Sequence, residues 1–311
     1  MNKIKKLSVV IPVYNCIDTL EELFNRLENN LKNIVKDYEI IFVDDSNDFK
    51  SWEILNLISK KSNKTLCIKL SRNFGQHAAI MAGLNNSTGD WIIIMDCDLQ
   101  DRPEEIKNLI KACDVKTDII FASRKKRSDN LIKKLSSKFF YFLIEFLCEI
   151  KMDHTVSNFG LYSRKVIEAV LSINDNHKFF PLMVRWTGFQ SKTIDIKHDE
   201  RTKGKSSYNL KKSLLISISA IVSFSNKPLR IFIYFGFLIS LISIIVAFYF
   251  LYLALNDKIT VIGWASVILS IWFFGGMFLS SVGIVGFYIG KTFDQTKKRP
   301  SYIISKKLNF D

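Results

Sequence analysis

The chain has 311 residues, of which 48% are hydrophobic, and it carries a formal net charge of +14. This length allows about two domains, and the basic charge favours an anionic partner, either nucleic acid or a membrane surface. Because no nucleic-acid-binding motif is present, we expect membrane lipid and no nucleic acid among the partners.

The cysteines and the N-terminus indicate the compartment. The cysteines are odd in number and show no zinc-ligand spacing, which predicts reduced cytosolic thiols. They are Cys16, Cys67, Cys97, Cys113 and Cys148. The opening residues, MNKIKKLSVV, lead into a predicted strand and not into an apolar targeting core, so we expect no signal peptide.

Strands and helices are predicted to alternate over the first part of the chain. Apolar runs typical of strands occupy residues 7–13, 38–43, 65–70, 91–95 and 118–122. Helical patterns lie between them, as at 18–35 and 103–112. This alternation predicts an α/β fold, a Rossmann-like and mostly parallel sheet with helices on both faces.

A polar cluster follows each predicted strand. Any one of these clusters is compatible with an ordinary turn. In a parallel sheet, however, the carboxyl ends of the strands meet at one edge, where ligands bind. The sequence therefore predicts a ligand site built from YNC (14–16), DDSND (44–48), SRNFGQH (71–77), DCDLQD (96–101) and SRKKR (123–127).

Three aspartates, Asp96, Asp98 and Asp101, follow the fourth predicted strand. One interpretation is a solvated loop that caps the next helix, with Pro103 in its first turn. The other is a cation site, because crowded carboxylates repel one another unless a positive charge lies among them. Mg²⁺ held by one or two carboxylates usually completes its shell with phosphate oxygens. The D-x-D spacing therefore favours a nucleotide diphosphate as the ligand.

Two segments before the apolar C-terminal region are predicted to be amphipathic. Residues 130–150 have an apolar helical face, which is typical of an interfacial helix or of a helix packed on the sheet or on a partner subunit. Residues 209–230 are predicted as a juxtamembrane amphipathic segment.

Two later segments, 231–255 and 259–290, contain no charged residue, and each is long enough to span a bilayer. They predict a transmembrane hairpin with its turn at 256–258. Basic residues flank both spans and fill the tail at 291–311. Positive flanks stay cytoplasmic, so we expect a multi-pass inner (plasma) membrane protein with both termini and its soluble domain in the cytoplasm. In the second span, Gly286 and Gly290 have G-x-x-x-G spacing, which is compatible with a homo-oligomer or with packing on the first span.

These features together resemble the family 2 glycosyltransferases of GT-A fold. Within that family the chain is similar to membrane-anchored polyprenyl-phosphate glycosyltransferases, the relatives of dolichol-phosphate mannose synthase and of bacterial undecaprenyl-phosphate sugar transferases. The matching stretches are VVIPVYN (9–15), IIFVDDSND (40–48), SRNFGQHAAIMAGL (71–84), DCDLQDRPEE (96–105), RWTGF (185–189) and RTKGKSSY (201–208).

The resemblance implies a cytosolic catalytic domain over residues 1–208 and an inverting, metal-dependent enzyme. Such an enzyme moves a sugar from a nucleotide diphosphate sugar, here expected to be a UDP-sugar, to a polyprenyl phosphate, here expected to be undecaprenyl phosphate. The lipid-linked product would serve cell-envelope glycan or lipopolysaccharide modification. The implied cofactor is Mg²⁺ or Mn²⁺.

The resemblance also implies roles for individual residues. The implied nucleotide-binding residues are Pro12, Tyr14, Asp44, Asp45 and Asp96. The implied metal ligands are Asp96, Asp98 and Gln100, and the implied catalytic residues are Asp96, Asp98 and Arg201. The implied contacts to the lipid phosphate or the diphosphate are Arg124, Arg201, Ser206 and Tyr208.

Three positions depart from the family pattern. Cys16 stands where members often have Glu, and Asn158 and Gly160 stand in a segment where many have D-F-R-L. A missing base at position 158 need not abolish transfer, because a phosphate monoester is already ionised near neutral pH. Catalysis then depends on stabilising the leaving group.

The alternatives to this function are a processive polysaccharide synthase, which usually needs more spans, and a catalytically silent GT-A membrane scaffold.

Overall fold

The computed structural model describes residues 4–124, 145–147, 156–175, 178–197, 199, 225–256 and 263–310. The chain divides into two compact units. The first unit comprises Met1–Phe146, Ile150–Leu215 and Arg299–Asp311, and the second comprises Leu147–Glu149 and Ile216–Lys298. The chain therefore passes from the first unit to the second twice, briefly at Leu147–Glu149 and then over Ile216–Lys298, and its C-terminal end belongs to the first unit.

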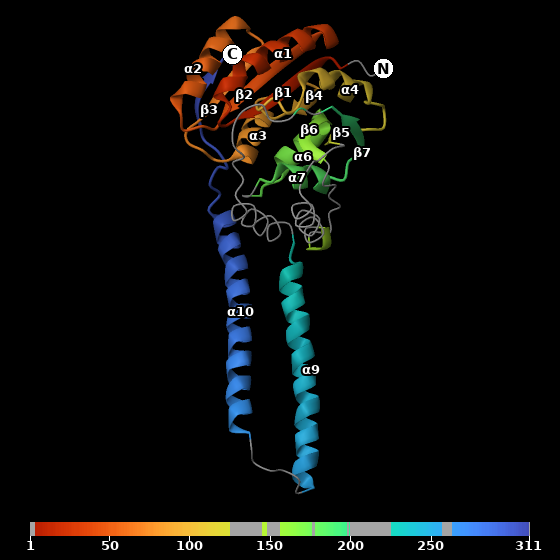
Figure 1. The fold of residues 1–311 in the computed structure, drawn as a ribbon, viewed down its shortest axis with the longest axis vertical. Helices are drawn as coiled ribbons and strands as arrows, with labels where there is room; N and C mark the ends of the chain where they lie inside the picture. Colours follow the sequence, from red (N-terminus) through yellow and green to blue (C-terminus); the bar gives the residue numbers. More distant parts are fainter. Residues whose placement is uncertain are drawn as a thin grey trace. The chain divides into compact units, whose positions relative to one another are not determined.

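Within the described residues, eight strands form one sheet in the order β7-β5-β6-β4-β1-β2-β3-β8 (Figure 1). β1 pairs in parallel with β2 and β4, and β2 pairs in parallel with β3. β6 is antiparallel to both β4 and β5, so β5 points the same way as β1 to β4. The strands are β1 Lys6–Val13, β2 Asp37–Asp44, β3 Thr65–Leu70, β4 Trp91–Ile94, β5 Ile119–Arg124, β6 Val156–Ser163, β7 Ser191–Ile196 and β8 Ile304–Leu308.

Helices connect the parallel strands, because a parallel pair cannot be joined by a short hairpin. The first unit contains η1 Ile17–Thr19, α1 Leu20–Ile34, α2 Phe49–Lys61, α3 Gln76–Asn85, η2 Pro103–Glu105, α4 Ile106–Lys111, α6 Arg164–Ser172 and α7 Phe180–Trp186. Asp48 caps α2 by accepting a hydrogen bond from Lys50 N–H, and Pro103 opens η2.

The apolar faces of these helices cover the sheet. Side chains of α1, α2 and α4 form one buried cluster with alternate residues of β1 and β2, including Leu27 of α1 and Val9 of β1. Burial of one such side chain contributes about 1.5–3 kcal/mol. α3 packs against β1 and β2 as well, and its buried residues lie outside that cluster. The α/β class predicted from the sequence is confirmed.

The carboxyl ends of β1 to β5 lie at one edge of the sheet, as their shared direction requires. β6 was not predicted, and it separates β4 from β5. The strand end at Arg124 is therefore one strand removed from the end of β4.

The C-terminal segment, predicted only as a basic tail, contributes a strand. β8 pairs antiparallel with β3 and places Leu308 opposite Cys67. After β8, Asn309 Nδ2 donates hydrogen bonds to the carbonyl oxygens of Ser59 and Thr65, at 2.8 and 2.9 Å. These contacts cover backbone groups of β3 that would otherwise form an open sheet edge.

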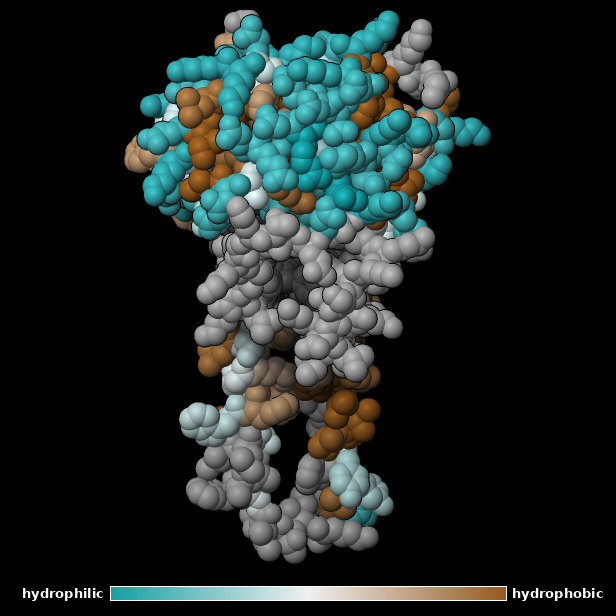
Figure 2. Space-filling model, turned by 45° about the horizontal axis from the view of Figure 1, so that its top comes forward, coloured by the Kyte–Doolittle hydropathy of each residue, from teal (hydrophilic) through white to brown (hydrophobic). Residues whose placement is uncertain are grey.

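The second unit contains two long helices, α9 Lys227–Leu255 and α10 Trp264–Thr296. Both are long and apolar enough to cross a membrane, judged by length and composition. Hydrophobic side chains such as Phe237 and Trp272 are 77% exposed, and hydrophobic surface gathers on these helices (Figure 2). The hydroxyl of Tyr288 donates to Ser225 O at 2.9 Å, which joins α10 to the residues before α9.

The helix ends differ from the predicted spans. α9 begins four residues before the predicted start at 231, and α10 begins at Trp264, with Gly263 as its N-cap, five residues after the predicted start at 259. Residues 257–262 lie outside the described residues. At Gly286 and Gly290, no described atom lies within 4 Å of where a Cβ would be. Self-association through these glycines stays a prediction. The predicted helix at 130–150 lies outside the described residues except at 145–147, which are helical, and so does the segment 209–224.

A buried carboxylate joins the strands at the amino-terminal edge of the sheet. Glu39 of β2 accepts hydrogen bonds from Ser8 Oγ at 2.7 Å and from the backbone and hydroxyl of Thr88, and it pairs with Lys6 at 2.9 Å. Burial alone would raise the pKa of Glu39, but these donors lower it overall. Because the pKa of Glu39 is lower in the folded chain, its ionisation stabilises the fold at pH values above the ordinary carboxyl pKa of 4.5. That contribution is lost as the pH falls through the folded value.

We predict that Glu39→Ala lowers the free energy of unfolding by about 3 kcal/mol, because it leaves several donors and Lys6 without their acceptor. Glu28→Ala, which removes an i,i+4 ion pair with Lys32 on α1, should cost less than about 0.5 kcal/mol. Thermal unfolding of the purified full chain compares the two variants. Equal destabilisation would contradict the importance given to the Glu39 network.

Candidate active site

Two loops lie side by side beyond the ends of β1 and β4. Each contains a non-glycine residue in the left-handed region, Asn15 at φ 55° and Leu99 at φ 62°. For leucine this conformation costs roughly 1–2 kcal/mol, and the burial of Leu99, which is 5% exposed, offsets that cost. Such strain is common at functional sites.

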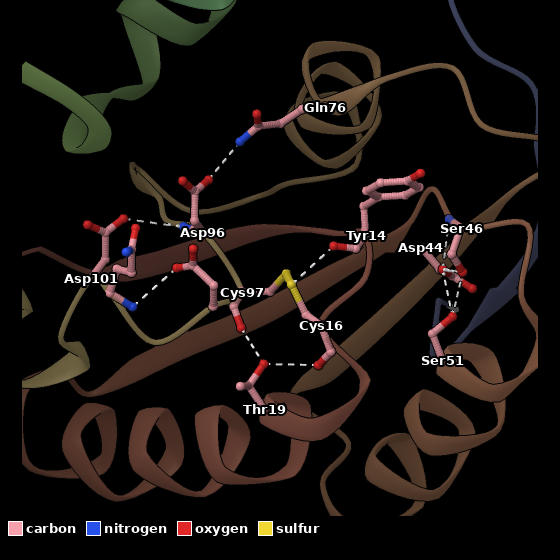
Figure 3. The surroundings of a disulfide bond; sticks show 12 residues. Tyr14, Cys16, Thr19, Asp44, Ser46, Ser51, Gln76, Asp96, Cys97 and Asp101 are labelled. Atoms are coloured by element: carbon pink, nitrogen blue, oxygen red, sulfur yellow. Dashed lines mark hydrogen bonds between the residues drawn. A yellow bond between two sulfur atoms is a disulfide. The ribbon is translucent and has the colours of Figure 1, made fainter. Parts of the chain in front are cut away.

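A disulfide connects these loops, and it corrects the prediction of reduced thiols. Cys16 and Cys97 are bonded, with Cα atoms 6.0 Å apart and a sequence separation of 81 (Figure 3). Their spacing along the chain did not indicate this pair, because only the pairing of β1 with β4 brings the loops together. The hydroxyl of Thr19 contacts both carbonyl oxygens, Cys16 O at 2.9 Å and Cys97 O at 2.7 Å. Cys67 and Cys113 are free, and Cys148 lies outside the described residues.

The D-x-D turn after β4 is held by its own backbone and by a neighbouring helix. Asp98 Oδ1 accepts the N–H of Gln100 at 3.2 Å. The N–H of Asp96 points to Oδ2 of the fully buried Asp101 at 3.4 Å. Asp96 Oδ1 accepts a hydrogen bond from Gln76 Nε2, on α3, at 2.7 Å (Figure 3). Asp96 and Asp98 are both half-buried.

This donor set suits a hard divalent cation that takes further ligands from a substrate. Carboxylate oxygens are the ligands that Mg²⁺ and Mn²⁺ prefer. Among the described residues, no group of three or more His, Cys, Asp or Glu side chains converges as a metal site. The protein thus offers two carboxylates, Asp96 and Asp98, with Gln100 following them. Phosphate oxygens would have to supply much of the remaining shell.

Asp44, at the end of β2, has one carboxylate oxygen engaged and one without a hydrogen bond. Oδ1 accepts from Ser46 Oγ at 2.5 Å and from Ser51 Oγ at 3.0 Å. Oδ2 is buried, has no hydrogen-bond donor among the described residues and lies 3.8 Å from Lys69 Nζ. A buried carboxylate oxygen of this kind suits a ligand N–H or O–H.

Asp45, predicted as a nucleotide contact, is engaged inside the protein. Its two oxygens accept the backbone N–H groups of Phe74 and Gly75, at 2.7 and 2.8 Å, and it is 2% exposed. Burial raises the pKa of Asp45, and the two N–H donors oppose that rise. Asp45 therefore fixes the loop before α3 and has no oxygen turned to solvent for a nucleotide.

The structure describes some of the other predicted site residues and leaves others outside the described ranges. Pro12 is buried in β1, and Tyr14, just beyond it, is 44% exposed beside the disulfide (Figure 3). Arg124 is the last residue of β5, and its side chain is outside the description. Arg201, Ser206 and Tyr208 lie outside the described residues.

Asp199 brings the chain that precedes Arg201 to the D-x-D turn. Its N–H donates to Gln100 O at 3.1 Å, and its carboxylate lies 2.8 Å from Nε of Arg102. The Arg102 contact is an ion pair and not an aligned hydrogen bond, since Nε lacks a hydrogen-bond partner. Asp199, far along the chain, thus contacts the segment that follows β4 at two points, Gln100 and Arg102.

Gly160 departs from the family pattern for a steric reason. It lies in β6 between β4 and β5, and a Cβ there would meet Ile120 O at 2.9 Å. An arginine at this position would require the backbone of β5 to move. Asn158 lies two residues earlier on the same strand, and its carbonyl accepts the hydroxyl of the buried Tyr162 at 3.2 Å.

Sequence reasoning missed Gln76, Thr19 and Asp199. Gln76 lies in a polar cluster that was assigned to the site edge, but nothing singled out its side chain. Thr19 and Asp199 have no local signal, because each contacts the site segment from far along the chain. Thr19 is 78 residues from its partner Cys97, and Asp199 is 99 residues from its partner Gln100.

Comparison with known proteins agrees with this geometry. The family model described as glycosyl transferase family 2 matches residues 8–171. An undecaprenyl-phosphate 4-deoxy-4-formamido-L-arabinose transferase of Photorhabdus laumondii is 33% identical, over 98% of this chain and 94% of that protein. A prophage bactoprenol glucosyl transferase homolog of Escherichia coli is 31% identical, over 97% of this chain and 99% of that protein.

A solved structure shares the fold. The mannosyltransferase PcManGT of Pyrobaculum calidifontis, determined with GDP-Man and Mn²⁺, superposes with a TM-score of 0.50 at 14% sequence identity. The match covers 74% of this chain and 65% of that one. This likeness supports the α/β, GT-A type of fold.

We predict that reducing the Cys16–Cys97 bond lowers the free energy of unfolding by about 2–4 kcal/mol, because the unfolded chain regains the freedom of a long loop. Peptide mapping without reductant should recover the two cysteine peptides joined. Thermal unfolding with and without reductant measures the loss. Cys113→Ser serves as the control and should respond to reductant as the unmutated chain does, whereas a Cys16→Ser, Cys97→Ser double variant should not respond.

Proposed function

The chain is a member of glycosyl transferase family 2, and we propose that it transfers a sugar from a nucleoside diphosphate sugar to a polyprenyl phosphate. The D-x-D turn carries this proposal, because it presents Asp96 and Asp98 at the strand edge where the Asp44 carboxylate also lies. The two bacterial relatives, an undecaprenyl-phosphate sugar transferase and a bactoprenol glucosyl transferase homolog, support a polyprenyl phosphate acceptor.

We propose a UDP-sugar as the donor. Oδ2 of Asp44 accepts no hydrogen bond among the described residues, although it lies 3.8 Å from Lys69 Nζ, and it is suited to the N–H of a uracil ring or to a ribose hydroxyl. Tyr14 is exposed near this carboxylate and offers an aromatic face to the nucleoside. Pro12 lies at the same strand end. The donor's diphosphate would then extend toward the D-x-D turn.

The proposed cofactor is Mg²⁺ or Mn²⁺, held by Asp96 and Asp98 with Gln100 beside them. When bound, such an ion stabilises negative charge on the diphosphate. The protein's own contribution is to keep two carboxylates in place at a half-buried edge. The Asx turn at Asp98 and the hydrogen bond from Gln76 to Asp96 support that role.

The proposed reaction is a direct displacement with inversion. An oxygen of the lipid phosphate attacks the anomeric carbon, and the bond from that carbon to the nucleoside diphosphate breaks. The attacking phosphate is largely ionised near neutral pH, so no proton has to move to a protein base. A neutral Asn158, at a position where relatives often have a carboxylate, is compatible with a transfer that needs no protein base. The nucleoside diphosphate leaves with the electron pair.

Arg201 is proposed to contact the reacting phosphates, because its planar group can donate two hydrogen bonds to phosphate at once. It follows Asp199 by two residues, a span of at most about 7 Å. Asp199 is bound to the D-x-D turn, which supports this role. Arg124, Ser206 and Tyr208 are proposed as further phosphate contacts on family resemblance alone.

We propose that α9 and α10 cross the plasma membrane and anchor the enzyme beside its lipid substrate. Both ends of this helical hairpin continue into the same folded unit. If both helices cross, the loop between them therefore lies on the side opposite to the catalytic unit. Flanking Lys and Arg residues favour the cytoplasm for the catalytic unit, where nucleotide sugars are made.

The test is incubation of the purified full chain in lipid with undecaprenyl phosphate and a panel of nucleotide sugars. Mass spectrometry of the lipid fraction should find one sugar joined to the lipid phosphate. A lengthening polymer would indicate a processive synthase instead. Absence of product with every donor would indicate a catalytically silent scaffold.

We predict that Asp98→Asn lowers turnover on the order of 100-fold, because a neutral amide is a poor ligand for a hard cation. Arg201→Ala should lower turnover while leaving nucleotide binding in place. Asp114→Asn, which changes an exposed aspartate before β5, is the matched control and should keep full activity. Normal turnover of Asp98→Asn with Mg²⁺ or Mn²⁺ would refute the metal assignment.

The proposed topology makes a separate prediction. In a chain without native cysteines, a cysteine at Asn256 should react with an impermeant maleimide added outside intact cells. A cysteine at the exposed Arg299 should not react until the membrane is opened. The reverse labelling pattern would place the catalytic unit on the side without cytosolic nucleotide sugars.

A further inference from the structure

Gln76 is the first residue of α3, and its side chain crosses from that helix to the D-x-D turn. The amide Nε2 lies 2.7 Å from Asp96 Oδ1, and the two residues are half-buried (Figure 3). The resemblance assigns no role to Gln76. An amide donor is neutral, so it can hold a carboxylate in one orientation without neutralising the charge that a cation needs.

The backbone that carries Gln76 is itself held in place. Asp45 binds the N–H groups of Phe74 and Gly75, and Gly75 adopts φ +96°, a conformation that favours glycine. α3 starts at the next residue, Gln76, and the N–H of Ala79 in its first turn donates to Gly75 O. The end of β2 thus fixes where α3 begins, and α3 in turn fixes where the Gln76 amide points.

The neighbouring histidine does not compete for this role. Burial lowers the pKa of His77 to about 4, so the ring is neutral near pH 7. It packs edge-on against Phe179 with ring centres 4.7 Å apart. The contact from α3 to Asp96 is therefore the neutral hydrogen bond from Gln76.

We infer that Gln76 is a positioning residue that orients Asp96 for the metal and diphosphate of the donor. The inference rests on the proposed function, since it deepens the role given there to Asp96. Groups that hydrogen-bond to metal-binding carboxylates orient them, and their loss typically weakens metal affinity 10–100-fold. The alternative is that the Gln76 amide only helps to anchor the start of α3.

The experiment measures Mn²⁺ affinity of the full chain in lipid nanodiscs with saturating UDP, by electron paramagnetic resonance of free Mn²⁺. Gln76→Met keeps the length of the side chain but removes the donor, and it should weaken Mn²⁺ binding on the order of tenfold. Gln76→Ala should do the same, which guards against a packing effect of either variant. Asn85→Ala is the matched control, because it removes a side-chain amide hydrogen bond, to Tyr302 at 2.7 Å, from the other end of α3. It should leave the affinity unchanged.

A double-mutant cycle separates positioning from anchoring. If Gln76 acts through Asp96, adding Gln76→Met to Asp96→Asn should cause little further loss of Mn²⁺ affinity. Additive losses, or unchanged affinity in both single variants at Gln76, would overturn the inference. Because affinity is read without turnover, a wild-type chain that binds Mn²⁺ and UDP but transfers no sugar would count against the proposed function alone.

Discussion

Parallel pairing of β4, β1, β2 and β3 is the constraint on which the rest of the structure depends. Parallel neighbours must each be reached by a helical crossover, so every one of these strands ends at the same edge. Residues from four separate stretches of sequence then meet there without any need for long loops. Asp44 and Asp96 are brought to one edge by this geometry, and the acids need only short local contacts to hold them.

The parts of the fold with local periodicity could be predicted, and the parts that depend on distant pairing could not. β1 to β5 are apolar runs bounded by polar clusters, and each was expected within two residues of its observed limits. β6 and β8 had no such signal, because their stability comes from the strands beside them. In the site, the acids of the D-x-D turn were expected from their spacing. The Cys16–Cys97 bond and the Gln76 contact depend on which strands are neighbours.

The site concentrates negative charge and yet uses mainly neutral donors to hold it. Serine hydroxyls bind Asp44, backbone N–H groups bind Asp45, and an amide binds Asp96. Neutral donors stabilise a carboxylate and leave its charge uncancelled, whereas an arginine in direct contact would satisfy it. A cation also faces one of these acids, because Lys69 Nζ lies 3.8 Å from Asp44 Oδ2. At the opposite edge the buried Glu39 pairs with Lys6 at the shorter distance of 2.9 Å.

The position of β8 has a consequence for how the protein is made. β3 comprises residues 65–70 and its partner β8 comprises residues 304–308, so α9 and α10 must be synthesised before β8 can complete the sheet. Until then the outer edge of β3 exposes unpaired backbone groups, which readily pair with other chains. A chain truncated within either long helix would keep that edge open and would tend to aggregate. Completion of the enzymatic unit is thereby tied to synthesis of both helices.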